Sequence, residues 1–196
     1  ELPEEVESVV LAAYGPAYDY LAMKGLVEQL LETAGVKEVR YVRNAAGTTY
    51  HPGRCADIYV GQEKLGVIGE LHPAVLANYG VKPRVVAVEL NMDVLFAHRG
   101  GTALFRPLPK HPSTARDLAL VADLEVPAAA IAEHIEKAAG SLLESLTLFD
   151  VYTGEHMAAG KKSLAYNLVL RASDRTLTDE ETDNTVQNVL KSLEEI

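Results

Sequence analysis

The sequence has little of what several classes of protein depend on. It contains one cysteine, Cys55, which excludes an internal disulfide framework and fits a reducing compartment. No apolar run approaches the roughly 20 residues that a membrane-spanning helix needs. The first ten residues, ELPEEVESVV, are acidic and lack the charged-then-apolar pattern of a signal peptide. These absences predict a soluble, cytoplasmic, globular chain with no membrane partner.

Basic charge is also scarce. Eighteen lysines and arginines stand against 28 aspartates and glutamates, which gives a formal net charge of -10. Both halves are acidic, with 9 basic and 13 acidic residues over 1–105 and 9 basic and 15 acidic residues over 106–196. Non-specific binding of nucleic acid usually depends on a basic surface. Any contact with RNA is therefore expected to be local and to depend on shape.

The usual motifs of catalysis are missing as well. Residues 1–105 contain no Gly-rich phosphate loop, no nucleophile paired with a base and no convincing carboxylate cluster. We predict that the chain has no catalytic residue and no cofactor of its own. His51, Cys55 and His72 are candidate metal ligands, but no short paired motif such as CxxC joins them. We therefore expect no metal site, and we interpret the histidines as loop residues that hold turns.

The first half of the chain, residues 1–105, is predicted to be α+β. Apolar spacing predicts an amphipathic helix over residues 3–13 and another over 20–34, the latter burying four side chains: Leu26, Val27, Leu30 and Leu31. Strand-like runs CADIYV and KLGVIGEL flank Gly61-Gln62-Glu63 and predict an antiparallel hairpin. The remaining predicted elements are a strand over 37–43, a short helix over 72–79, a strand over 84–90 and a helical turn over 93–96.

Residues 97–112 are rich in Gly and Pro and have no sustained period, so we place the domain boundary there. The second half, residues 106–196, then predicts five elements: a strand over 117–124, a helix over 127–139, strands over 147–152 and 162–170, and a final helix. Thr178 followed by Glu181 forms a capping box that starts this last helix. The order β-α-β-β-α belongs to the ferredoxin-like split β-α-β fold.

Strand parity predicts which side chains leave each face of this second sheet. The side chains expected to face the helices are Leu118, Leu120, Phe149, Val151, Leu164, Tyr166, Leu168 and Leu170. Those expected on the open face are Ala119, Val121, Leu148, Asp150, Tyr152, Ser163, Ala165 and Asn167. Small residues, an aromatic ring and hydrogen-bonding groups on an uncovered face are a platform for unpaired bases. The alternatives are an ordinary solvated face or one covered by another domain.

Several runs in the sequence resemble a known family. FDVYTG and GKKSLAYNLVLRASDRTLTDEE, together with RDLALV after KHPSTAR, resemble the C-terminal anticodon-binding domain of the bacterial phenylalanine–tRNA ligase beta chain. HPGRCADIYVGQEKLGVIGELHP, preceded by YDYLAMKGLVEQLL and followed by VVAVELNMDVL, is similar to the catalytic-like module of the same chain. The two blocks occur in the order of the family and cover nearly all of the sequence. The resemblance implies the last portion of a much longer polypeptide.

The resemblance implies an (αβ)2 ligase that uses ATP and magnesium to attach phenylalanine to its tRNA, with the chemistry on the alpha chain. Residues 1–105 would be an inactive class II synthetase-like module, and residues 106–196 the ferredoxin-fold anticodon-binding domain, serving tRNA recognition and subunit assembly. By motif, the family's contacts to the anticodon region fall on Asp150, Tyr152 and Ser163. Lys162, Arg171 and Arg175 lie close to these in sequence and are predicted phosphate contacts.

One departure and two alternatives remain. The family's domain ends with a fourth strand that this sequence lacks, so the strand over 117–124 is expected to have an unpaired edge that favours self-association. A stand-alone module that binds an amino acid for regulation is the alternative function, although it gives no reason for HPGR and IGELHP upstream. An independent enzyme using His51, Arg54 and His72 is a further possibility without an evident positioned partner.

Overall fold

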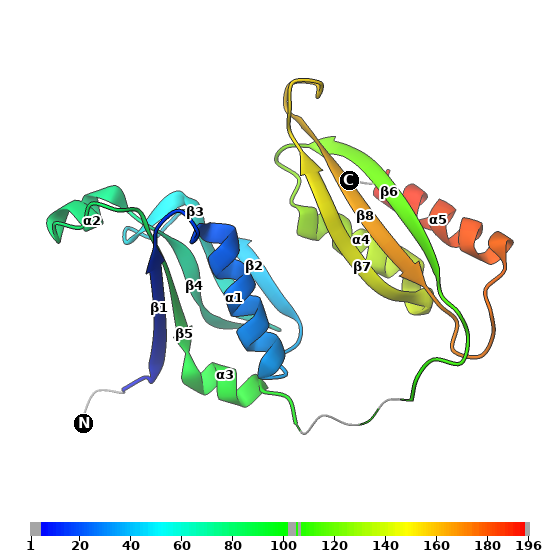
Figure 1. The fold of residues 1–196 in the computed structure, drawn as a ribbon, viewed down its shortest axis with the longest axis horizontal. Helices are drawn as coiled ribbons and strands as arrows, with labels where there is room; N and C mark the ends of the chain where they lie inside the picture. The colour runs from blue at the N-terminus through cyan, green and yellow to red at the C-terminus, as the bar shows by residue number, and fades with distance from the viewer. Residues whose placement is uncertain (1–4, 102–104, 106, 195–196) are drawn as a thin grey trace. The chain divides into compact units, whose positions relative to one another are not determined.

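The computed structural model describes residues 5–101, 105 and 107–194, and it divides into two compact units, residues 1–105 and 106–196 (Figure 1). We call these unit 1 and unit 2. Each has its own antiparallel sheet and its own hydrophobic core, which confirms the predicted α+β class. In the part of the chain that is described, no helix is long and apolar enough to cross a membrane.

Unit 1 is a five-stranded sheet, and two of its helices, residues 20–33 and 92–98, contribute to the core on one face (Figure 1). Its strands lie in the order β1-β5-β4-β3-β2, and every neighbouring pair is antiparallel. Met23 and Val27 of the first helix pack with Ile68 and Val88 of the sheet, and all four are buried. The elements are β1 (Ser8–Tyr14), α1 (Tyr20–Thr33), β2 (Val39–Arg43), β3 (Tyr50–Val60), β4 (Glu63–Leu71), α2 (Pro73–Asn78), β5 (Val85–Asn91) and α3 (Met92–His98).

The predicted helix over residues 3–13 is wrong. Residues 8–14 form strand β1, which pairs with β5 along its whole length, and residues 3 and 4 lie outside the described part. Val9, Leu11 and Ala13 pack against the core, while Val10 between them is exposed. The run VVLAA is apolar at every position, so its spacing fits a helix or a strand equally well. Pairing with β5, which no local pattern reveals, decides for the strand.

The other elements of unit 1 confirm the prediction, apart from the burial along α1. Asp19 caps this helix by accepting a hydrogen bond from the Ala22 amide at 2.8 Å. Val27 and Leu31 are buried as predicted, but Leu26 and Leu30 are 49% and 40% exposed. Helix α1 carries apolar residues on two faces, so the sequence alone does not choose which face packs on the sheet.

Unit 2 has the predicted order β-α-β-β-α. Its elements are β6 (Thr114–Asp123), α4 (Ala128–Ala139), a 3-10 turn (Gly140–Leu142), β7 (Leu143–Tyr152), β8 (Lys161–Leu170) and α5 (Asp179–Leu193). The strand order is β6-β8-β7, and both pairings are antiparallel. Within the described residues, β6 and β7 each pair only with β8 and are therefore the edges of the sheet.

Both helices of unit 2 pack on the same face of its sheet (Figure 1). Ile131 and Ile135 of α4 and Val189 of α5 are buried against the central strand β8. The hydroxyl of buried Tyr166 donates a hydrogen bond of 2.8 Å to the carbonyl oxygen of Ala128, so the phenol is not left unpaired in the core. Among the described residues of unit 2, no helix packs on the other face of the sheet.

The capping box of α5 is confirmed. The Thr178 hydroxyl accepts from the Glu181 amide at 3.2 Å, and the Glu181 carboxylate accepts from the Thr178 amide at 3.0 Å. The hydrogen bond from the Thr178 amide, helped by the nearby Arg175 guanidinium, holds the pKa of Glu181 below its ordinary value. The start of α5 is thus fixed by local chemistry that the sequence shows directly.

Candidate nucleic-acid interface

The uncovered face of unit 2 brings three of the predicted site residues together at the end of β8 that meets the hairpin. Tyr152 of β7 pairs with Ser163 of β8, and Asp150 pairs with Ala165. Directly opposed residues of an antiparallel pair leave the sheet on the same side. Asp150, Tyr152 and Ser163 therefore share one face, and Ala165 lies in the central strand between Asp150 and Ala119.

The floor of this face is built from small side chains. Ala119 and Ala165 oppose each other across β6 and β8, so no large group fills the centre. Val121 and Tyr152, 66% and 41% exposed, rise on either side of Ser163. A shallow floor, an aromatic ring, a hydroxyl and a carboxylate suit one flat, hydrogen-bonding ligand such as an unpaired base.

The ring of Tyr152 lies against the backbone of Gly154 in the hairpin loop. A Cβ atom added at Gly154 would overlap the hydroxyl and the adjoining ring carbon of Tyr152. Gly154 does not have a positive φ, so its backbone conformation does not require glycine. Glycine is needed here because it has no side chain. Gly154 therefore sets where the ring can lie.

A β-bulge changes the predicted faces of β7. The pairing runs from Leu148–Tyr166 to Asp150–Ala165, so Phe149 has no partner in β8 and is 56% exposed. Leu148, predicted on the open face, therefore shares the helix side with Tyr166, and Phe149 is the extra residue of the bulge instead of a core residue. One inserted residue reverses the relation between residue number and face, so the predicted alternation fails at Leu148 but holds beyond the bulge. Asp150 and Tyr152 consequently remain on the open face.

Lys162 does not lie on the open face with these residues. It pairs with Ala122 of β6 on the helix side, and its ammonium group donates to the carbonyl oxygens of Leu124 and Val126 at 3.0 and 2.6 Å. The side chain thus fastens the connection between β6 and α4. A phosphate contact by Lys162 would require it to give up both hydrogen bonds.

Arg171 and Arg175 lie beyond the opposite end of β8. Eight residues of strand separate Ser163 from Arg171, or about 26 Å. The guanidinium of Arg171 donates to Glu144 at 2.9 Å and to the carbonyl oxygen of His111, and that of Arg175 pairs with Asp174 and Glu181. The structure therefore gathers only Asp150, Tyr152 and Ser163 of the six predicted residues.

Lys161 is a basic residue on the open face that the sequence reasoning missed. It lies opposite Asp123 in the pairing of β8 with β6, and the two side chains form an exposed ion pair of 2.8 Å. The alternation of side chains along β8 would have predicted this position for Lys161, because residue 161 lies two positions before Ser163 on the same strand. Lys161, and not Lys162, is the lysine placed beside the trio.

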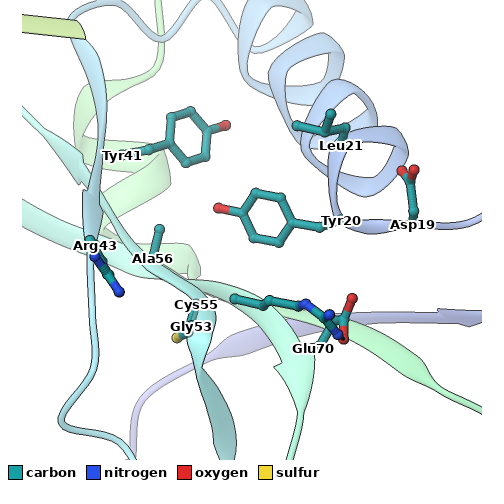
Figure 2. A pocket seen from close by; sticks show the side chains of 10 residues that line it. Asp19, Tyr20, Leu21, Tyr41, Arg43, Gly53, Cys55, Ala56 and Glu70 are labelled. Atoms are coloured by element: carbon teal, nitrogen blue, oxygen red, sulfur yellow. Dashed lines mark hydrogen bonds and ion pairs between the residues drawn. The ribbon is translucent and has the colours of Figure 1, made fainter. Parts of the chain in front are cut away.

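Unit 1 contains an open cavity of about 510 Å³ beside the start of α1 (Figure 2). The rings of Tyr20 and Tyr41 lie one above the other in this view, with their hydroxyls pointing in opposite directions. The Tyr41 hydroxyl is buried without a hydrogen-bond partner among the described residues. Burial raises the pKa of both phenols and of the Cys55 thiol. These groups are protonated near neutral pH and are poor nucleophiles or bases.

The buried carboxylate of the cavity is already paired. Glu70 is 5% exposed and accepts from Arg54 at 2.7 Å, with Arg84 at 3.5 Å. A carboxylate held by two guanidinium groups has no free charge for a metal ion. Arg54, Arg84 and Glu70 therefore form an ion-pair cluster at this cavity.

His51 and His72 hold turns, as the sequence analysis expects. A ring nitrogen of His51 accepts from the Gly53 amide at 3.1 Å, and one of His72 accepts from the Ala74 amide at 3.2 Å, capping α2. Among the described residues, no three His, Cys, Asp or Glu side chains are grouped so as to hold a metal ion. With Arg54 bound to Glu70, the three residues considered for an independent enzyme are all engaged in local structure.

Comparison with known families assigns a module to each unit. Residues 109–196 match the ferredoxin-fold anticodon binding domain, and residues 1–92 match the CLM domain of the phenylalanyl tRNA synthetase beta chain. These two matches identify modules of an aminoacyl-tRNA synthetase. The chain belongs to the family of phenylalanine–tRNA ligase beta subunits and corresponds to their C-terminal portion, which confirms the resemblance seen in the sequence.

Curated relatives are much longer than this chain. The phenylalanine–tRNA ligase beta subunit of Clostridium tetani is 41% identical over 193 residues, which are 98% of this chain and 24% of the relative. That of Symbiobacterium thermophilum is 42% identical over 208 residues, covering 98% of this chain and 23% of the relative. The chain therefore spans about a quarter of the length of these relatives.

Proposed function

We propose that unit 2 recognises the anticodon region of the tRNA that accepts phenylalanine. The observation that carries this proposal is the shared face of Asp150, Tyr152 and Ser163 on a unit that matches an anticodon-binding family. Tyr152 offers a ring for stacking, and the carboxylate and hydroxyl offer hydrogen bonds to the edge of a base. The alanine floor leaves room for that base.

Stacking and hydrogen bonding, more than charge, carry this recognition. The whole chain has a net charge of -10, and Lys161 on the open face is paired with Asp123. Lys162, Arg171 and Arg175 are engaged in internal hydrogen bonds. Each phosphate neutralised by a basic group steepens the salt dependence of binding. We therefore expect a shallow salt dependence for the contribution of this chain.

We propose that the complete enzyme is a cytoplasmic (αβ)2 ligase that uses ATP and magnesium, with aminoacylation on the alpha chain and unit 1 as an inactive module for assembly. The engaged Glu70 and the protonated phenols of unit 1 support this division. We expect no adenylate formation by this chain alone, and phenylalanine-dependent ATP–pyrophosphate exchange above a buffer control would contradict that. A stand-alone regulatory module leaves the match of residues 1–92 unexplained.

The experiment that tests recognition is a binding measurement with two tRNAs. This chain is titrated with the tRNA that accepts phenylalanine and with the same tRNA carrying a different anticodon. We expect tighter binding of the unaltered tRNA at every salt concentration. Equal affinity of this chain for both tRNAs would contradict the proposal. A full ligase that binds neither tRNA would contradict it as well.

A further inference from the structure

Helix α1 carries a second, uncharged stripe, rich in small and apolar residues, that no other described residue of unit 1 covers. Its inner face packs Met23, Val27 and Leu31 on the sheet. The outer stripe is exposed throughout and consists of Ala22, Gly25, Leu26, Gln29, Leu30 and Thr33. These positions follow each other at the spacing of one helix face. A helix that is apolar on two faces is expected to have two packing partners.

Charge distinguishes the outer stripe from the rest of the solvent side of α1. The stripe has no charged residue, whereas Lys24, Glu28 and Glu32 form an adjacent row at intervals of four residues. Lys24 and Glu28 make an ion pair within that row. An uncharged stripe beside a charged row is typical of a helix that packs against another helix. The lack of lysine and arginine also argues against a nucleic acid as the partner.

Gly25 lies in the middle of α1, where unit 1 gives no reason for a glycine. A Cβ atom at this position would meet nothing within 4 Å, and the backbone does not have a positive φ. Glycine in a helix interior is less favourable than alanine, so the residue destabilises the isolated helix. A neighbour that approaches the helix axis closely would account for it, because interaxial distance depends on side-chain size at the contact.

We propose that this outer stripe binds an apolar helix from the upstream part of the beta subunit. About three quarters of the length of the curated relatives lies outside this chain, which corresponds to their C-terminal portion. An uncharged stripe with partly exposed Leu26 and Leu30 suits a permanent contact within one polypeptide. The proposal does not depend on tRNA recognition by unit 2, so the two can fail separately.

Thiol labelling tests the proposal directly. Gln29→Cys places a thiol in the centre of the stripe, and Glu28→Cys places one on the adjacent charged row. Each variant is made in this chain and in the full-length beta subunit purified without the alpha chain, and labelling is followed by mass spectrometry of the α1 peptide. We expect Gln29→Cys to react at least tenfold more slowly in the full-length subunit, while Glu28→Cys reacts equally in both.

The other outcomes contradict the proposal. Equal reactivity of Gln29→Cys in both proteins would mean that the stripe is exposed in the subunit. Protection that appears only when the alpha chain is added would assign the stripe to the alpha chain. Protection that appears in this chain itself as its concentration rises would assign it to a second copy.

Gly25 gives an independent measurement. In this chain, Gly25→Leu is expected to leave the melting temperature unchanged or to raise it, because leucine favours a helix and meets open space. In the full-length subunit the same variant is expected to lower the melting temperature, since the added side chain would push the upstream helix away. Glu28→Leu is the size-matched control and should behave alike in both proteins. A rise for Gly25→Leu in the full-length subunit would overturn the proposal.

Discussion

Tyr152 lies directly opposite Ser163 in the antiparallel pairing of β7 with β8, and the ring of Tyr152 rests against the backbone of Gly154. The first relationship places a ring and a hydroxyl on the same uncovered face. The second is possible only because Gly154 has no side chain in the space that the end of the ring occupies. Together they make the hairpin end of the sheet a defined surface, although most of its residues are exposed.

Gly154→Ala is expected to weaken tRNA binding by the intact ligase without unfolding unit 2. The added methyl group would occupy the space of the Tyr152 ring and force it away from its present position. Gly47→Ala is the matched control, because a Cβ atom there meets nothing within 4 Å. Filter-binding or fluorescence titration with tRNA would show the difference. Identical dissociation constants for the two variants would mean that the position of the ring is irrelevant to binding.

Lys162→Met is expected to lower the stability of unit 2 instead of the salt dependence of tRNA binding. The variant removes two hydrogen bonds to the carbonyl oxygens of Leu124 and Val126, which corresponds to about 1–3 kcal/mol. Lys161→Met removes only the exposed pair with Asp123 and should cost less than about 1 kcal/mol. Urea denaturation of both variants compares them. A larger loss for Lys161→Met would show that the two lysines have been assigned to the wrong faces.

The capping box of α5 predicts a pH dependence of stability. The pKa of Glu181 is lowered from its ordinary value of 4.5 in the folded chain, so its ionised form is favoured by folding. The resulting stabilisation is fully present above pH 4.5 and is lost as the pH falls through the lower folded pKa. Denaturation at a series of pH values should show wild type and Glu181→Gln converging on the acid side. A stability difference that grows on acidification would contradict this sign.

Local chemistry explains what the sequence predicts well. The Thr178–Glu181 box, the Gly61-Gln62 turn and the alternation of β8 each depend on neighbours in the sequence, and each appears as expected. Tyr152 and Ser163 share a face because they are directly paired beyond the bulge, where the predicted alternation holds. Patterns of this kind can be recognised from the order of the residues alone.

The predictions that were wrong depend on pairing between distant segments or on a single inserted residue. Residues 8–14 form a strand only because β5 lies beside them, and the apolar run itself is ambiguous. The bulge at Phe149 shifts Leu148 to the helix side without any glycine or proline to announce it. Proximity in sequence groups Lys162 with Ser163, although adjacent residues of a strand face opposite sides.

Binding of the tRNA that accepts phenylalanine by the intact ligase carrying Tyr152→Ala tests the central claim most directly. Loss of one stacking ring should weaken binding by about 1–3 kcal/mol, roughly tenfold to a hundredfold, and leave adenylate formation unchanged. Tyr79→Ala, which removes an 81% exposed tyrosine from unit 1, should leave both unchanged. An unchanged dissociation constant for Tyr152→Ala, together with a lower melting temperature, would show that the ring serves packing and not recognition.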